Sequence, residues 1–144
     1  MNDIITADKT YTAFFHEVKN KVQETRIEIY RKTNRKLIQF YMWLGAQIVL
    51  KQVQHGWGKA VVEQLSKDMK IAFPDAKGFS TRNLWLMRQF YTEYRDKEIL
   101  QQLVAEIPWG HNLLIINKID SCEAREVYLR QSAAMGWSRN VLQL

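Results

Sequence analysis

The apolar residues of this 144-residue chain recur with the period of an α-helix almost throughout. No segment shows the strict alternation of apolar and polar residues that indicates a strand. Only six glycines and two prolines interrupt the pattern, and this scarcity favours long helices. We therefore predict an all-α, multi-helix bundle with little or no sheet. The only places where short strands of a wing would fit are near Phe73 and Ile107.

The first 56 residues carry two apolar stripes separated by the polar sequence RKTNRK, residues 31–36. The first stripe predicts a helix from an N-cap at Asp8 to Arg31, and the second predicts one from Leu37 to Gln54. We interpret residues 8–56 as a long helical hairpin within a single module of residues 1–144. The pattern does not separate burial within one chain from burial between two, so a homodimer is left open.

Two segments begin alike: KGFSTRNLWLMRQFYTEYR, residues 77–95, and MGWSRNVLQL, residues 135–144. In each, a serine stands where its hydroxyl can accept from the free amides of a first helical turn, so Ser80 and Ser138 are predicted N-caps. Two hydrophobic staples follow from the same spacing: Phe79 with Leu84 and Trp137 with Leu142. Because the sequence stops soon after Ser138, we expect one domain of a longer protein.

The net charge of +6 favours acidic partners, of which nucleic acid is the commonest. A predicted helix over 59–73 precedes the one begun at Ser80, and residues 57–144 therefore predict a helix-turn-helix-like part. The candidate DNA contacts are the side chains of Arg82, Asn83, Arg88, Gln89 and Arg139. On a helical wheel of residues 81–95, one arc is apolar and holds Leu84, Leu86, Met87, Phe90, Tyr91 and Tyr94. Trp85 lies on the opposite, polar arc with Arg82, Arg88 and Gln89, and an exposed indole there is a candidate interface residue. A solvated helix face that happens to carry arginines is the alternative.

The sequence predicts no catalytic residue, metal site or cofactor in this segment. A PD-(D/E)XK nuclease needs an Asp and a (D/E)-x-K pair on a sheet, whereas the triplets at 17–19, 68–70 and 75–77 fall on predicted helices or in a turn. The three histidines show no metal-ligand spacing. Neither a signal peptide nor a membrane span is predicted. The single cysteine, Cys122, excludes an internal disulfide and favours a cytoplasmic protein.

Five segments, taken in order, resemble the N-terminal domain of YhcG-type bacterial proteins. They are NRKLIQFYMWLGAQI, GWGKAVVEQLSKDM, FPDAKGFSTRNLWLMRQFY, IPWGHNLLIINKI and AREVYLRQSAAMGWSRNVL. The full-length members of that family resemble PD-(D/E)XK nucleases in their C-terminal part. The resemblance implies a helical DNA-binding module that positions such a nuclease domain, itself absent from this chain. The alternative is a dimerisation or protein-interaction module without direct DNA contact.

Overall fold

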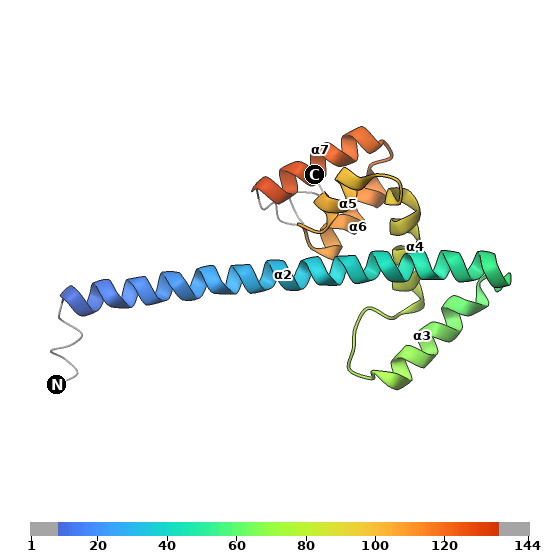
Figure 1. Ribbon diagram of the computed structural model, residues 1–144, viewed down its shortest axis with the longest axis horizontal. Helices are drawn as coiled ribbons and strands as arrows, with labels where there is room; N and C mark the ends of the chain where they lie inside the picture. Colours follow the sequence, from blue (N-terminus) through green and yellow to red (C-terminus); the bar gives the residue numbers. More distant parts are fainter. Residues whose placement is uncertain (1–8, 136–144) are drawn as a thin grey trace. The chain divides into compact units, whose positions relative to one another are not determined.

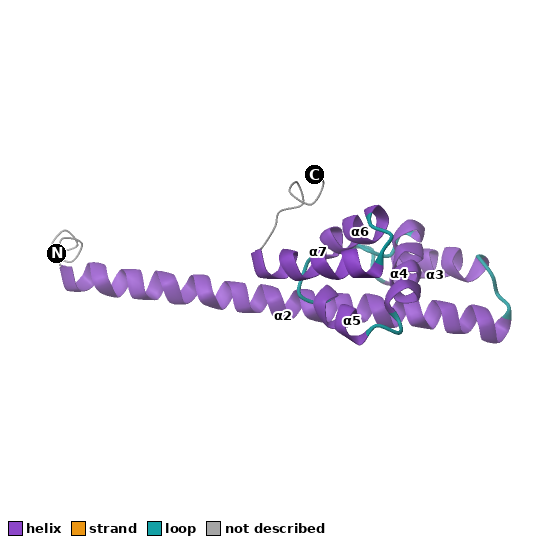
Figure 2. Cartoon of the chain, turned by 90° about the horizontal axis from the view of Figure 1, so that it is seen from above, coloured by secondary structure: helices purple, strands orange, loops and turns teal. Residues whose placement is uncertain are grey.

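The computed structural model describes residues 9–135, and in this range it contains six α-helices and no strand. The all-α prediction is confirmed, and neither Phe73 nor Ile107 lies in a strand. No helix of the described range is long and apolar enough to cross a membrane. The helices are α2 (Lys9–His55), α3 (Ala60–Ala72), α4 (Thr81–Tyr94), α5 (Glu98–Val104), α6 (Trp109–Lys118) and α7 (Cys122–Met135), as shown in Figures 1 and 2.

The predicted hairpin over residues 8–56 is wrong, because α2 runs through the RKTNRK segment without a break. This segment contains no glycine or proline, and arginine and lysine are good helix formers. A polar stretch therefore marks a change of surroundings along one helix, and not a turn. The Asn34 side chain illustrates this change, since its Nδ2 donates to the carbonyl oxygens of Ala105 and Ile107 at 3.3 and 2.8 Å.

The chain divides into two compact units between Thr33 and Asn34, inside α2. In the described part of the first unit, residues 9–33, every side chain is exposed. In the second unit, residues 34–55 of α2 bury one face, and α3 to α7 follow.

The second unit has two clusters of buried side chains, and α4 contributes to both. Phe90 and Tyr94 join the first cluster, together with Ile38 of α2 and residues of α5, α6 and α7. Leu84 and Met87 join the second cluster with α2 and α3. The buried residues of α4 therefore match the apolar arc expected from its helical wheel.

Helices α2 and α4 approach each other closely at Gly45. This residue is buried, and a Cβ added to it would collide with the backbone carbonyl of Met87. The carbonyl belongs to the helix backbone and cannot rotate away as a flexible side chain would. Glycine is therefore required at position 45 by the packing of the two helices.

We expect Gly45→Ala to destabilise the protein by about 1 to 3 kcal/mol, the usual cost of overpacking. Helix propensity alone predicts the opposite sign, a gain of about 1 kcal/mol. Urea unfolding monitored by circular dichroism distinguishes the two. A variant as stable as the wild type, or more stable, would contradict the close approach.

Candidate nucleic-acid interface

The start of α4 is built by a short sequence of local interactions. Gly78 has a φ of 100°, a left-handed conformation that favours glycine, and an added Cβ would also lie 2.6 Å from the Tyr41 hydroxyl. Ser80 is the N-cap, and its Oγ accepts from the amide of Asn83 at 3.1 Å. Phe79 packs against the second cluster, to which Leu84 belongs, as the staple requires. The predicted cap and staple are therefore confirmed, whereas the second pair, around Ser138, lies outside the described residues.

Asn83 is used by the fold and is not available to read a base. Its Nδ2 donates to the carbonyl of Gly78 at 2.7 Å, and its Oδ1 accepts from Nε1 of Trp109 at 2.9 Å. Burial raises the pKa of the Tyr41 phenol, and a hydrogen bond with Asn83 offsets part of that rise. This side chain thus joins the turn before α4 to α2 and α6, and we withdraw it from the candidate DNA contacts.

Replacing Asn83 with alanine should destabilise the protein by about 1 to 3 kcal/mol, because the Trp109 N–H and the Gly78 carbonyl lose their partner. The adjacent change Arg82→Ala should leave stability within about 0.5 kcal/mol, since that side chain is exposed. The melting temperatures of the two variants, measured by thermal unfolding, test this difference in stability. Equal melting temperatures would show that Asn83 does not hold the turn.

The remaining candidate side chains on α4 differ in their exposure and in the contacts that they make within the protein. Arg82 is exposed and forms no ion pair or hydrogen bond within residues 9–135. Arg88 is half-buried, donates from Nε to Oε1 of Gln52 at 2.7 Å, and lies 5.8 Å from the Trp85 ring centroid. Trp85 is partly buried against the second cluster, so the exposed indole inferred from the wheel is wrong. Gln89 is half-buried.

The connection between α3 and α4 is too long for the predicted helix-turn-helix motif. That motif has a turn of three or four residues, whereas residues 73–80 form an eight-residue connection. The three-residue connections lie elsewhere, at 95–97 between α4 and α5 and at 119–121 between α6 and α7. A contact between α4 and DNA therefore does not follow from a helix-turn-helix motif.

Charged residues are unevenly distributed along the second unit. Residues 51–92 contain seven lysines and arginines against three acidic residues, whereas residues 93–126 contain four against seven. Six of the seven basic side chains are exposed and form no ion pair with any described residue. We call these six the basic segment: Lys51, Lys59, Lys67, Lys70, Lys77 and Arg82. The five lysines of the basic segment lie outside α4, so a helical wheel of that helix does not include them. Counting charged residues in successive windows of the sequence would have identified them.

Two of the four cations in residues 93–126 are paired with carboxylates. Arg125 is buried, and its Nη1 lies 2.9 Å from a Glu93 oxygen while its Nη2 donates to the carbonyl of Ile116 at 3.1 Å. Arg95 lies 3.8 Å from the carboxylate of Asp96. Lys36, Lys97 and Lys118 also form no ion pair with a described residue, so the basic segment holds most, but not all, of the unpaired positive charge of the described second unit.

Two exposed aromatic residues flank α3. The Trp57 side chain is 50% exposed and stacks on the His55 ring, with centroids 4.4 Å apart. Phe73, directly after α3, is 56% exposed. Exposed aromatic rings among lysines are the combination on which nucleic-acid bases stack.

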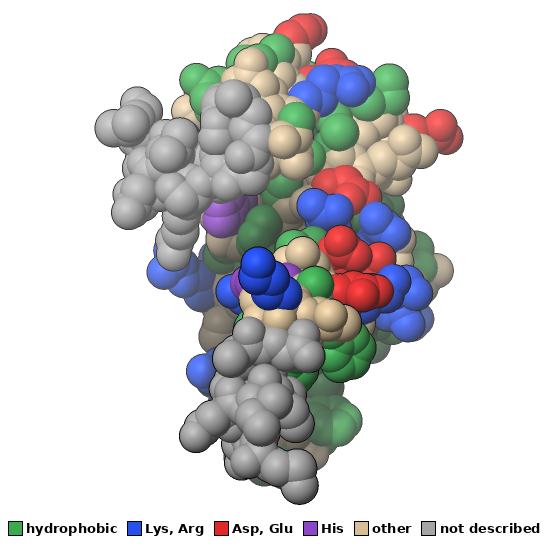
Figure 3. Space-filling view, turned by 90° about the vertical axis from the view of Figure 1, so that its left-hand side faces the viewer, with side chains coloured by type: hydrophobic (Ala, Val, Ile, Leu, Met, Phe, Trp, Pro, Cys, Tyr) green, Lys and Arg blue, Asp and Glu red, His purple; other side chains and the backbone are tan. Residues whose placement is uncertain are grey.

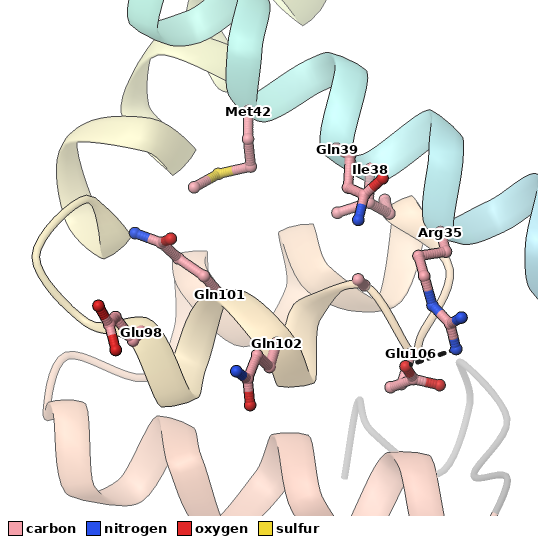
Figure 4. A pocket seen from close by; sticks show the side chains of 9 residues that line it. Arg35, Ile38, Gln39, Met42, Glu98, Gln101, Gln102 and Glu106 are labelled. Atoms are coloured by element: carbon pink, nitrogen blue, oxygen red, sulfur yellow. Dashed lines mark hydrogen bonds and ion pairs between the residues drawn. The ribbon is translucent and has the colours of Figure 1, made fainter.

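The described chain also contains a hollow of about 420 Å³ beside α5 (Figure 4). Its apolar lining comes from Ile38, Met42 and Ala105, and the ion pair of Arg35 with Glu106, at 2.9 Å, closes one end. None of its lining residues is a histidine, cysteine or serine. The hollow therefore offers no histidine base and no cysteine or serine nucleophile.

No set of three His, Cys, Asp or Glu side chains within residues 9–135 is close enough to hold a metal ion. The triplets at 17–19 and 68–70 lie on α2 and α3, and the one at 75–77 lies in the connection before α4. Arg139 lies outside the described residues.

Comparison with known proteins places these features in a family. The family described as "DUF1016 N-terminal domain" matches residues 17–144. A curated relative, "Putative nuclease YhcG" of Escherichia coli (strain K12), is 30% identical over 90 residues. That match covers 60% of this chain and 24% of the relative, so the chain spans about a quarter of the relative's length. No solved structure matches.

Proposed function

This chain belongs to the family of DUF1016 N-terminal domains, and from that premise we propose that it is a DNA-binding module that positions a PD-(D/E)XK-type nuclease domain. The relative described as a nuclease supports the association with DNA chemistry. The observation that carries the proposal is the basic segment, six exposed and unpaired cations within residues 51–82. The module itself holds DNA, and the chemistry belongs to the nuclease domain.

The expected binding mode is dominated by phosphate contacts. Lysine and arginine side chains neutralise backbone phosphates and release condensed counterions, so affinity falls steeply as salt rises. Arg82 differs from the lysines because it stands in the first turn of α4, which has no acidic residue. A cation there is mildly unfavourable against the helix dipole, and a phosphate bound at the helix N-terminus reverses that penalty.

The test is a titration of a short duplex with the purified protein, followed by fluorescence anisotropy at several salt concentrations. The affinity should fall with salt by a power close to the number of phosphate contacts. No binding at low salt, or binding that does not depend on salt, would rule the proposal out.

Arg82→Ala should weaken binding by about 1 to 3 kcal/mol if the guanidinium bonds a guanine edge. If it holds only a phosphate, the loss should be smaller and the salt slope should decrease by about one. Arg130→Ala is the matched control, because Arg130 is already paired with Glu126 at 2.9 Å on α7. Unchanged binding by the Arg82 variant, with both proteins folded, would remove α4 from the interface.

Residues 1–144 should not cleave DNA in the presence of Mg²⁺ or Mn²⁺. The reason is that the described residues offer no metal-binding carboxylate set. Incubation of supercoiled plasmid with purified protein, followed by electrophoresis, measures this. Metal-dependent nicking that is lost in Asp75→Ala would show that the segment carries a catalytic site of its own.

A second function, association with another protein chain, is favoured by a different observation. The described part of the first unit exposes many large apolar side chains, which a DNA contact does not explain. These exposed apolar side chains therefore indicate a protein partner for the first unit.

A further inference from the structure

We propose that residues 9–33 of α2 form a parallel, two-stranded coiled coil with a second copy of this chain. The inference concerns the first unit alone and does not depend on DNA binding. It rests on the spacing of exposed apolar side chains, on their residue types and on the charges beside them.

Five of the eight large apolar side chains exposed in residues 9–33 follow a heptad repeat, with intervals of four and three residues, and Phe14, Ile27 and Tyr30 lie outside it. Phe15, Val22 and Ile29 occupy the a positions of this repeat. Tyr11, Val18 and Thr25 occupy the d positions, and Lys32 ends the series. We call the a and d residues from 11 to 29 the seam.

The seam is accessible to solvent in the single chain. The five apolar side chains of the seam are between 39% and 61% exposed. Hydrophobic side chains reach the surface among charged ones elsewhere on the described chain as well (Figure 3). Burying apolar surface stabilises by about 25 cal/mol per Å², and a helix without a packed face has little else to stabilise it. A second helix pairing with the seam supplies that burial.

A second copy is the occupant that fits the sequence. A heptad seam of three repeats is typical of pairing between two long helices, and α2 is such a helix in every copy. Val22 and Ile29 are β-branched residues at a positions, a residue type that is common at the core positions of coiled coils. Aromatic residues occupy only the N-terminal part of the seam, at Tyr11 and Phe15.

The charges on the two sides of the seam favour the parallel orientation. The e side is basic, with Lys19 and Arg26, whereas the g and c positions on the other side carry three glutamates, Glu17, Glu24 and Glu28, against Lys21 and Arg31. A parallel pair places the e side of one helix against the g side of the other. An antiparallel pair would place the two basic sides together.

One residue opposes this arrangement and is locally compensated. Lys21, at a g position, faces Arg26 of the second copy in a parallel pair. Within its own helix, Lys21 has Glu17 four residues before it and Glu24 three residues after it, both within reach on the helix surface. The side as a whole therefore keeps its acidic character.

The first experiment measures the mass of the complete 144-residue chain by sedimentation equilibrium over a range of concentrations. The wild type should have twice the mass of one chain. Ile29→Lys places a charge in the seam and should raise the dissociation constant of the dimer by about 100-fold or more.

Ile27→Lys is the matched control, since it makes the same change two residues away on the same helix. Ile27 is 51% exposed and lies at an f position, opposite the seam. The control should remain a dimer, and circular dichroism should show equal helix content in both variants. A monomeric wild type would overturn the proposal and leave the seam to a different partner. A dimer that Ile29→Lys does not weaken would overturn the assignment of the seam.

The second experiment tests the orientation by cross-linking. In a Cys122→Ser background, Val18→Cys places one thiol at a d position, where parallel helices bring equivalent residues together. Mild oxidation should then give a disulfide-linked dimer, whereas Ile27→Cys should give far less. A dimer that forms no cross-link at position 18 would overturn the parallel arrangement.

Discussion

The close packing of α4 against α2 at Gly45 is the contact on which the second unit depends. Only α2 and α4 contribute buried residues to both apolar clusters, so their approach joins the two halves of the core. The absence of a side chain at Gly45 brings the Met87 backbone against α2. Trp109 adds a polar connection, since it packs against both clusters and donates to Asn83 in the first turn of α4.

The sequence predicts the fold well where the signals are local. Ser80 caps α4 because the hydroxyl and the amide that it accepts from are three residues apart, a distance fixed by helix geometry. The hairpin prediction failed because it interpreted the polarity of residues 31–36 as a turn. Arginine and lysine suit a helix surface as well as a loop, and the partners of Asn34 lie some seventy residues away in the chain. Local sequence carries no trace of such partners.

The same distinction explains the candidate site. A helical wheel separates the buried Leu84 and Phe90 from the exposed Arg82, because that separation depends only on α4. It does not show that Asn83 and Arg88 are bonded to Trp109 and Gln52, which lie on α6 and α2. A polar side chain on a helix surface is equally suited to hold DNA and to hold a neighbouring helix. Only the tertiary contacts decide between the two roles.

Dimerisation through the exposed seam would affect how tightly the unpaired cations of the basic segment bind DNA. Six exposed cations within 32 residues, 51–82, repel one another, and a bound polyanion relieves this repulsion. One such segment gives few phosphate contacts, and few contacts give weak binding at physiological salt. A dimer formed through the seam carries two basic segments, and binding of the first raises the effective concentration of the second. Dimerisation through residues 11–29 would therefore strengthen the proposed DNA binding without adding any contact to the second unit.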